Sequence, residues 1–422
     1  MTMLKNPFLY RKQPTPKSIY FWNAMNSICG AAINSLLLLV ITRLCGTSEG
    51  GVFSIAITTG QLMGTIALYE LRGYQVTDSR RQFVFSDYHT ARLCSIFATI
   101  LVGIGWIAAK GYTGEKAAAV NLATAIRMVE CYADILYGEW QLQDRLDLIG
   151  KSATFRMGAG LLIFTVVEVF THSLLQGLLV LLAFYLFWIF FVDWPITRHM
   201  ACLKIHFSKT LLPLFWTVTP LFIANYIYNY IISAPKLAID QYLQNETLQA
   251  YFGILFMPAS IINLFTYIVY RLVVTQLSRD WTKKNLPAFL KTVFQITAAI
   301  AGMTVLILLG GLWLGIPALN LIYGVKLDSY KATLIIILLG GGFSALASWL
   351  NMLMTVMRKQ RFMMLGYVLC LLPIMGGMPF LVQEMGLNGA ALGYLFAMIL
   401  LVVVFGTVVA ATFYRRQKGK DQ

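Results

Sequence analysis

The stretch LLQGLLVLLAFYLFWIFFV, residues 174–192, contains nineteen consecutive residues without a charged side chain. A helix of about 20 apolar residues is long enough to cross the ~30 Å hydrocarbon core of a bilayer. Blocks of similar length recur along the chain of 422 residues, in which 58% of the residues are hydrophobic and only 12% are charged. Soluble domains contain about 25% charged residues. This composition excludes a water-soluble enzyme, a disordered chain and a fibrous repeat, and it predicts an all-α polytopic membrane protein.

The hydropathy pattern predicts twelve transmembrane helices. Their approximate ranges are 18–41, 51–70, 91–109, 117–138, 150–170, 174–192, 211–234, 249–270, 288–309, 332–356, 362–382 and 389–412. The basic residues test this number independently, because Lys and Arg are enriched in cytoplasmic loops. If the loops alternate from a cytoplasmic N-terminus, 26 of the 33 Lys and Arg residues fall in cytoplasmic segments and 6 in outside loops, and Arg127 lies within a span. We therefore expect a multi-pass protein of the cytoplasmic membrane with both termini in the cytoplasm.

An even number of spans suggests two repeated halves. Three weakly matching pairs of segments occur in the same order in both halves. They are TRL 42–44 with PKL 235–237, GVFSI 51–55 with AYFGI 250–254, and DRLDLIG 144–150 with QRFMMLG 360–366. Each half contains six spans, so both halves run in the same direction through the membrane. We expect two six-helix lobes related by pseudo-two-fold symmetry: residues 1–205 with helices 1–6, and residues 206–422 with helices 7–12.

The sequence lacks the short motifs of P-loop ATPases and of zinc hydrolases. Neither GxxxxGK[ST] nor HExxH occurs, and the six cysteines are scattered without a CxxC pair. Hydrolysis of ATP through a P-loop and zinc chemistry are therefore not expected. We predict a protein that is not an enzyme and that has neither a cofactor nor a metal site. The net charge of +15 is explained by the cytoplasmic loops, so we expect no nucleic-acid partner.

Polar residues inside the predicted spans are costly in hydrocarbon and carry most of the functional information. Two helices, the first of each lobe, have a polar stripe that occupies roughly 100° or less of the helix circumference. The stripes contain Asn23, Asn26 and Asn34 in the first helix and Asn225, Asn229 and Lys236 in the seventh. Two interpretations stay open. The stripes form hydrogen bonds between helices, or they line a water-filled cavity between the lobes and bind substrate.

The fourth predicted helix carries three charges, Arg127, Glu130 and Asp134, on one face. A face with three charges is not expected to contact lipid. One interpretation is an internal ion-pair cluster that holds the lobe together. The other is a site for a coupling proton or cation, in which two carboxylates share one cationic partner. Such a site would serve to reset the empty carrier after transport.

Basic residues also stand at the ends of several predicted helices: Arg43, Arg72, Arg145, Lys236, Arg271 and Arg361. One interpretation is that they anchor the helices at the membrane interface and set the topology. The other is that some of them bind a phosphorylated head group, because arginine matches phosphate oxygens with two parallel hydrogen bonds.

Several segments resemble those of bacterial polysaccharide flippases. TRLCG 42–46 followed by GVFS 51–54 is similar to the signature that closes the first helix of these proteins. RGYQVTD 72–78, PKLAID 235–240, MP 257–258 and IYG 322–324 resemble further segments of the same group. The chain thus resembles O-antigen and capsule flippases of the Wzx type, in the multidrug/oligosaccharidyl-lipid/polysaccharide exporter superfamily.

This resemblance implies an alternating-access transporter that flips undecaprenyl-pyrophosphate-linked oligosaccharide units for the biosynthesis of surface polysaccharide, as capsule or lipopolysaccharide. Its expected partners are the lipid-linked oligosaccharide, membrane lipids and other polysaccharide-assembly proteins. We expect Arg43, Arg72, Lys236 and Arg271 to contribute positive potential along the path of the pyrophosphate. Two alternatives stay open: a drug/cation antiporter of the same superfamily, and a membrane-embedded polysaccharide polymerase or glycosyltransferase.

Overall fold

The structure is a computed structural model, and it describes residues 14–78, 82–359 and 361–418. Within these ranges, the side chains of residue 261 and of residues 263–272 are not described. Every regular element in the described ranges is a helix. The chain divides into two compact units, Met1–Tyr226 and Ile227–Gln422. This division falls within helix α9 (Leu211–Ala238), and the boundary at 205/206 expected from the hydropathy pattern stays a prediction.

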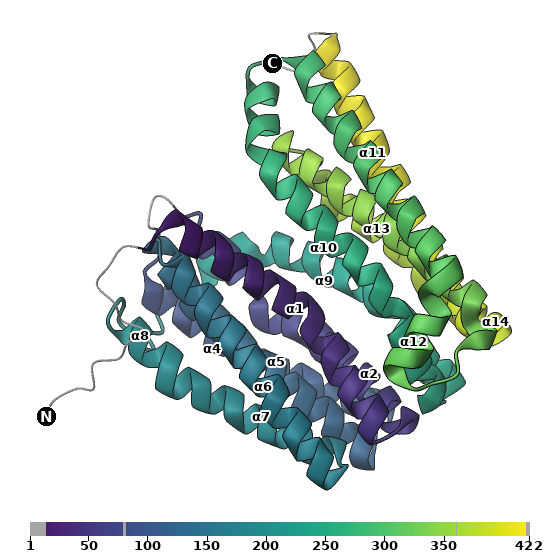
Figure 1. The fold of residues 1–422 in the computed structure, drawn as a ribbon. Helices are drawn as coiled ribbons and strands as arrows, with labels where there is room; N and C mark the ends of the chain where they lie inside the picture. Colours follow the sequence, from purple (N-terminus) through teal and green to yellow (C-terminus); the bar gives the residue numbers. More distant parts are fainter. Residues whose placement is uncertain (1–13, 79–81, 360, 419–422) are drawn as a thin grey trace, which may run out of the picture. The chain divides into compact units, whose positions relative to one another are not determined.

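The N-terminal unit is a bundle of long helices with short connections, drawn in purple to teal in Figure 1. Within it α1 packs on α6, and α2 packs on α5. The helices are α1 (Pro16–Leu44), α2 (Thr47–Leu68), α3 (Leu71–Gln75), α4 (Phe85–Lys110), α5 (Gly114–Leu142), α6 (Leu146–Thr171), α7 (Leu174–Trp188), a π-helical turn η1 (Ile189–Asp193) and α8 (Trp194–Arg198). The first part of α9 also belongs to this unit.

Close packing of α2 on α5 depends on a small residue at position 64. A Cβ atom built on Gly64 would overlap Cγ of Arg127, far inside van der Waals contact. The missing side chain therefore leaves the space through which Arg127 crosses toward α2. In this way a small-residue position of α2 sets the place of a charged residue on α5.

The C-terminal unit is a second helix bundle, in green to yellow in Figure 1. In it α13 packs against α10, α11 and α14. The elements that follow α9 are η2 (Ile239–Leu243), α10 (Glu246–Thr282), α11 (Leu286–Gly310), η3 (Gly311–Gly315), α12 (Ile316–Tyr323), η4 (Asp328–Tyr330), α13 (Lys331–Val356) and α14 (Arg361–Gln417). Gly386 has φ 58° and ψ −131° inside α14, a conformation that favours glycine. It separates α14 into the eleventh and twelfth predicted helices.

The predicted fold class is confirmed. Nine helical segments in the described ranges are long and apolar enough to cross a membrane. The further helices α5 and α10 are of similar length, and α14 contains two helices, so the described part of the chain accommodates the twelve predicted spans. The segment of α5 around Arg127, Glu130 and Asp134 lowers its hydropathy, which explains why α5 is not among the nine.

Some helices begin earlier than the hydropathy pattern predicts, and two arginines near the predicted starts are buried. The predicted third and fifth spans begin near residues 91 and 150, whereas α4 begins at Phe85 and α6 at Leu146. Arg92 and Arg156 lie within these predicted spans but were counted with the cytoplasmic segments, and both side chains are buried inside the N-terminal unit. Polar first turns lower the hydropathy that marks a span, so the pattern places the starts of these two helices too late.

Candidate functional site

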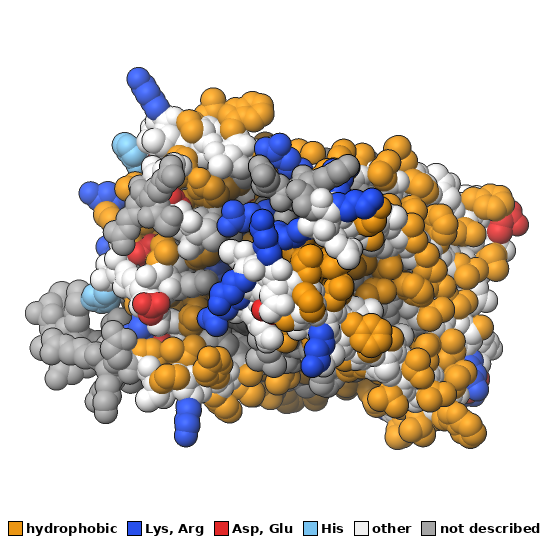
Figure 2. Space-filling model, turned by 90° about the horizontal axis from the view of Figure 1, so that it is seen from above, with side chains coloured by type: hydrophobic (Ala, Val, Ile, Leu, Met, Phe, Trp, Pro, Cys, Tyr) orange, Lys and Arg blue, Asp and Glu red, His pale blue; other side chains and the backbone are white. Residues whose placement is uncertain are grey.

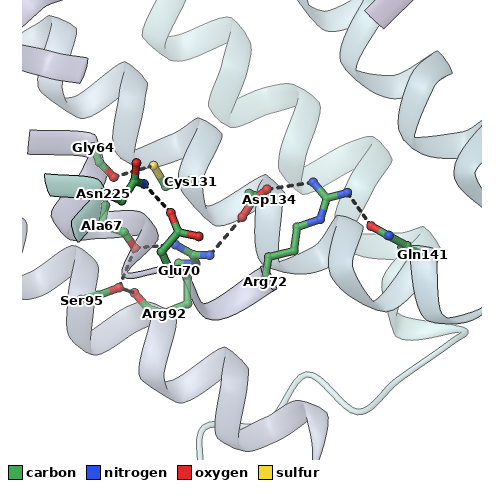
Figure 3. Close-up of polar contacts among 10 residues, drawn as sticks. All are labelled: Gly64, Ala67, Glu70, Arg72, Arg92, Ser95, Cys131, Asp134, Gln141 and Asn225. Atoms are coloured by element: carbon green, nitrogen blue, oxygen red, sulfur yellow. Dashed lines mark hydrogen bonds and ion pairs between the residues drawn. The ribbon is translucent and has the colours of Figure 1, made fainter. Parts of the chain in front are cut away.

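Two arginines converge on one carboxylate of α5, as Figure 3 shows. Nη1 of Arg72, from α3, lies 2.9 Å from Oδ1 of Asp134. Nη2 of Arg92, from α4, lies 3.1 Å from Oδ2 of the same residue. Arg72 also donates through Nη2 to Oε1 of Gln141 at 3.0 Å. Each oxygen of Asp134 therefore has its own cationic partner.

Arg92 is the buried member of this arrangement, and its side chain is 0% exposed. Its Nη1 donates to the carbonyl oxygen of Ala67 at 2.5 Å, and the Ser95 hydroxyl donates to the same oxygen at 2.7 Å. Ala67 lies in the last turn of α2, where carbonyl groups have no partner within the helix. Arg92 thus joins the end of α2 to α4 and α5. In the described part of the chain, Asp134 is the carboxylate with which it forms an ion pair.

The turn between α2 and α3 connects the arginines to α9. Both residues of this turn, Tyr69 and Glu70, have positive φ (41° and 54°), which is uncommon for residues other than glycine. Nδ2 of Asn225 donates to Oε1 of Glu70. The Tyr69 hydroxyl lies 2.9 Å from that of Thr219, and the Tyr69 ring stacks on Phe222. The strained turn therefore holds the first part of α9 against the end of α2.

The charged pair formed by Arg127 and Glu130 lies one to two turns away from Asp134 on α5. Nη1 of Arg127 lies 2.8 Å from Oε2 of Glu130. Both residues line a cavity of about 40 Å³, together with Asn34 of α1 and Gln61 of α2. One water requires roughly 10–15 Å³ on this measure. The cavity therefore has room for a few water molecules or a small cation, but not for a sugar or a pyrophosphate.

A third charged pair is deeply buried near the start of α6. Nη1 of Arg156 lies 3.6 Å from Oδ2 of Asp193 in η1. Asp193 accepts a hydrogen bond of 2.5 Å from the Ser152 hydroxyl and one of 3.2 Å from the Tyr137 hydroxyl. This pair was not predicted from the sequence. A signal was available, because Asp193 directly follows the uncharged stretch 174–192.

The structure brings together only some of the residues that the sequence predicts to act together. Arg127 and Glu130 form the expected ion pair, and Asn34 lies on the same cavity. Asp134 does not form an ion pair with Arg127 in the described part of the chain. Its partners are Arg72, which the sequence placed in a different group, and Arg92, which the sequence did not single out as a candidate site residue. The expectation of one three-residue charge cluster on α5 was therefore incomplete.

The other predicted substrate-binding residues are distributed over both units. Asn23 donates to the carbonyl oxygen of Ile19 in its own helix at 2.9 Å, and Nζ of Lys236 lies 5.4 Å from the centre of the Phe256 ring. Asn26 and Asn229 are half-buried, and Arg43 is exposed at the end of α1. The side chain of Arg271 lies outside the described residues. The role of all of these residues in binding stays a prediction.

The four charged side chains around Asp134 do not form a site with a net positive charge. Glu70 and Asp134 balance the formal charges of Arg72 and Arg92, so the four side chains are neutral as a group. Arg72 is 27% exposed, in contrast to Arg92. Figure 2 shows Lys and Arg side chains at several places on the viewed surface, among large areas of hydrophobic side chains. An anion can therefore reach Arg72, where exchange of a carboxylate partner for a phosphate oxygen is chemically feasible.

Comparisons with known proteins agree with the fold. No family model matches the sequence. A curated relative, the capsular polysaccharide biosynthesis protein CapF of Staphylococcus aureus, is 22% identical over 320 residues, which cover 74% of this chain and 79% of CapF. An inward-facing multidrug resistance MATE family transporter of the MOP superfamily has a TM-score of 0.65 at 12% identity, over 90% of this chain and 95% of that chain. The lipid II flippase MurJ, in an inward closed conformation, has a TM-score of 0.65 at 15% identity, over 94% of this chain and 89% of that chain.

The chain therefore has the polytopic membrane fold shared by MATE transporters and MurJ. This fold is the one that the sequence resemblance implies. The structural neighbours named here are transporters and not enzymes.

Proposed function

We propose that the chain is an alternating-access transporter that flips undecaprenyl-pyrophosphate-linked oligosaccharide units across the cytoplasmic membrane for surface polysaccharide biosynthesis. The main support is that two independent likenesses point to related chemistry. The fold is shared with a lipid II flippase, and three-quarters of the sequence align with a capsular polysaccharide biosynthesis protein. The fold alone would fit a multidrug transporter equally well. The sequence likeness favours a polysaccharide precursor as the substrate.

Arg72 is the residue through which we propose that the N-terminal unit contacts the pyrophosphate. Its guanidinium is partly exposed and is bound to Asp134 and Gln141. If Arg72 turned to a phosphate, Asp134 would keep Arg92 as its partner, so no carboxylate would be left without a cation. Arg43, Lys236 and Arg271 would add positive potential elsewhere on the path. The small cavity at Glu130 is too small to hold the head group.

We assign the coupling role to Glu130 rather than to Asp134. Both oxygens of Asp134 are bound by arginines, whereas Glu130 lies on a cavity that can admit a small cation or water. Movement of a negative head group outward is favoured by a negative-inside potential, by about 2.3 kcal/mol per charge and 100 mV. The forward step therefore needs no co-moving cation, and ion binding at Glu130 would serve the return of the empty carrier.

The same cavity is the observation that favours the second candidate, a drug/cation antiporter. A carboxylate on a small internal cavity suits exchange of a cation, and MATE transporters share the fold. This alternative makes no use of the partly exposed Arg72. It predicts that charge changes at Arg72 leave transport intact.

Deletion of the gene in its own host tests the proposed function. The deletion strain should lose surface polysaccharide and accumulate lipid-linked repeat units, and the wild-type gene should reverse both effects. Arg72→Ala should restore export poorly and Arg72→Lys better, with Arg415→Ala, an exposed arginine at the end of α14, as the control. Normal polysaccharide in the deletion strain, combined with greater sensitivity to cationic drugs, would instead support the antiporter.

A further inference from the structure

A second, larger cavity lies on the opposite face of α5 from Glu130. Its volume is about 590 Å³, and it is lined by α4, α5, α7 and the turns that follow α7. α5 contributes Ala125, Met128, Val129 and Tyr132, which at 100° per residue share one helix face and point away from Arg127 and Glu130. Because its walls are almost entirely apolar, water and ions are not suitable occupants.

The length of this cavity along the helix axis is close to the thickness of the hydrocarbon region of one leaflet. Along α7, η1 and α8 the lining residues run from Leu182 to Trp194, which spans about 18 Å at 1.5 Å per residue. Half of the ~30 Å hydrocarbon core is about 15 Å. Two side chains on its wall, Phe190 and Ile205, are 58% and 61% exposed. In a membrane protein, such side chains contact lipid chains.

One end of the cavity is polar and carries cations. There the His89 ring lies 3.0 Å from the Tyr132 hydroxyl and 3.4 Å from the carbonyl oxygen of Lys204. The guanidinium of Arg198 lies 4.6 Å from the centre of the Trp194 ring, which lines the cavity. The side chains of Arg198 and Lys204 are both exposed. An apolar slot with a cationic mouth is complementary to a lipid with a negatively charged head group.

The segment that leads into α9 forms part of this mouth. Leu203 and Ile205 line the cavity, and the backbone N–H of His206 donates to the Thr90 hydroxyl of α4 at 2.9 Å. A lipid in the cavity would therefore contact both the helix bundle and the segment 199–210 that precedes α9.

We propose that this cavity binds one acyl chain of an anionic phospholipid, with the phosphate next to Arg198 and Lys204. The lipid acts as a resident ligand of the N-terminal unit and not as the transported substrate. It packs the segment 199–210 onto α4 and so supports the connection to α9. The proposal does not depend on the identity of the substrate.

Photolabelling of the full-length protein in nanodiscs tests this site. The probe is phosphatidylglycerol with a diazirine in its acyl chain, diluted into phosphatidylcholine, and labelled peptides are identified by mass spectrometry. Labelling of residues 89–96, 125–132 and 182–194 should be saturable and competed by unlabelled phosphatidylglycerol. Ala125→Phe, which fills the cavity, should lower it about tenfold, the loss expected when roughly two methylene groups are displaced. Ala108→Phe, on an exposed part of α4, is the matched control and should have no effect.

A second variant tests the head-group assignment without changing the protein interior. This is the double variant Arg198→Glu/Lys204→Glu. Both positions are exposed, so it should fold normally. It should abolish the preference of the cavity for labelled phosphatidylglycerol over labelled phosphatidylcholine. Labelling that is not saturable and that does not respond to Ala125→Phe would overturn the site. A preference that survives the double charge reversal would overturn the head-group assignment.

Discussion

Replacement of Asp134 by asparagine should destabilise the N-terminal unit more than replacement of either arginine that contacts it. Asn keeps the size of the side chain and its hydrogen-bonding capacity but removes the charge. Arg92, which is 0% exposed, then loses the carboxylate with which it forms an ion pair in the described part of the chain, and only the longer-range attraction of Glu70 still acts on it. In contrast, Arg92→Met leaves Asp134 paired with Arg72, and Arg72→Met leaves it paired with Arg92.

The expected magnitudes follow from burial. Removal of one partner of a buried ion pair lowers the free energy of unfolding by about 3–5 kcal/mol. The lower end of this range is expected for Asp134→Asn, because Asp134 is 24% exposed. An exposed pair contributes about 0–1 kcal/mol, which is the range expected for Arg72→Met. For a unit of about 200 residues, ~3 kcal/mol corresponds to a decrease of roughly 6–12 °C in melting temperature. The double variant Arg92→Met/Asp134→Asn should be close to Arg92→Met alone, because no buried charge is left unpaired.

These differences can be measured by heating samples of the purified protein to a series of temperatures and quantifying the remaining folded protein by size-exclusion chromatography with fluorescence detection. Arg415→Met, at an exposed position, should melt like the wild type. The proposed role of the buried Arg92 charge fails if Asp134→Asn lowers the melting temperature no more than Arg72→Met does. It also fails if the double variant is less stable than Asp134→Asn, because the charge of Arg92 would then not be the cause.

Three further predictions concern coupling, topology and packing. Glu130→Gln should slow transport, and it should lower the melting temperature less than Asp134→Asn because the Arg127 side chain is 36% exposed; an unchanged transport rate would exclude a coupling role. Cys202 is the one cysteine with an exposed side chain, so a membrane-impermeant maleimide should label it in inverted vesicles but not in intact spheroplasts, and Cys202→Ser should abolish the signal. Labelling of Cys202 in spheroplasts would reverse the predicted orientation. Cys45 should not contribute to the signal, because the thiolate is the reactive form of cysteine. Burial, and to a smaller extent the hydrogen bond to Glu168, raises the pKa of the Cys45 thiol to about 12. Gly64→Val should lower stability by about 1–3 kcal/mol, the usual effect of overpacking, because its Cβ would overlap Arg127; a melting temperature equal to that of the wild type would show that α2 can move away from α5.

The fold could be predicted from the sequence because its signals are local. A transmembrane helix needs a run of about 20 apolar residues, and the loops between such runs carry the charges. These signals predict the twelve spans, although they misplace the first turns of α4 and α6. The Arg127–Glu130 pair could also be predicted, because residues three apart on a helix are neighbours.

The rest of the site could not be predicted from helix geometry, because it depends on contacts between distant segments. Asp134 is 62 residues from Arg72 and 42 from Arg92 in the sequence. Which arginine reaches Asp134 is decided by the packing of α2, α4 and α5, and that packing depends on side-chain volumes along all three helices. Asn225 and Glu70 are 155 residues apart and meet only because α9 packs on the end of α2.

Reconstitution into proteoliposomes tests the central proposal most directly. The vesicles contain an undecaprenyl-pyrophosphate-linked oligosaccharide with a fluorescent label on the sugar, and a membrane-impermeant quencher is added from outside. If the chain is a flippase for this class of lipid, the quenched fraction should rise from about half, the outer leaflet alone, toward complete quenching, and Arg72→Ala should slow the rise. Quenching that stops at the level of protein-free vesicles, while the same vesicles exchange a cationic dye for protons, would contradict the proposal.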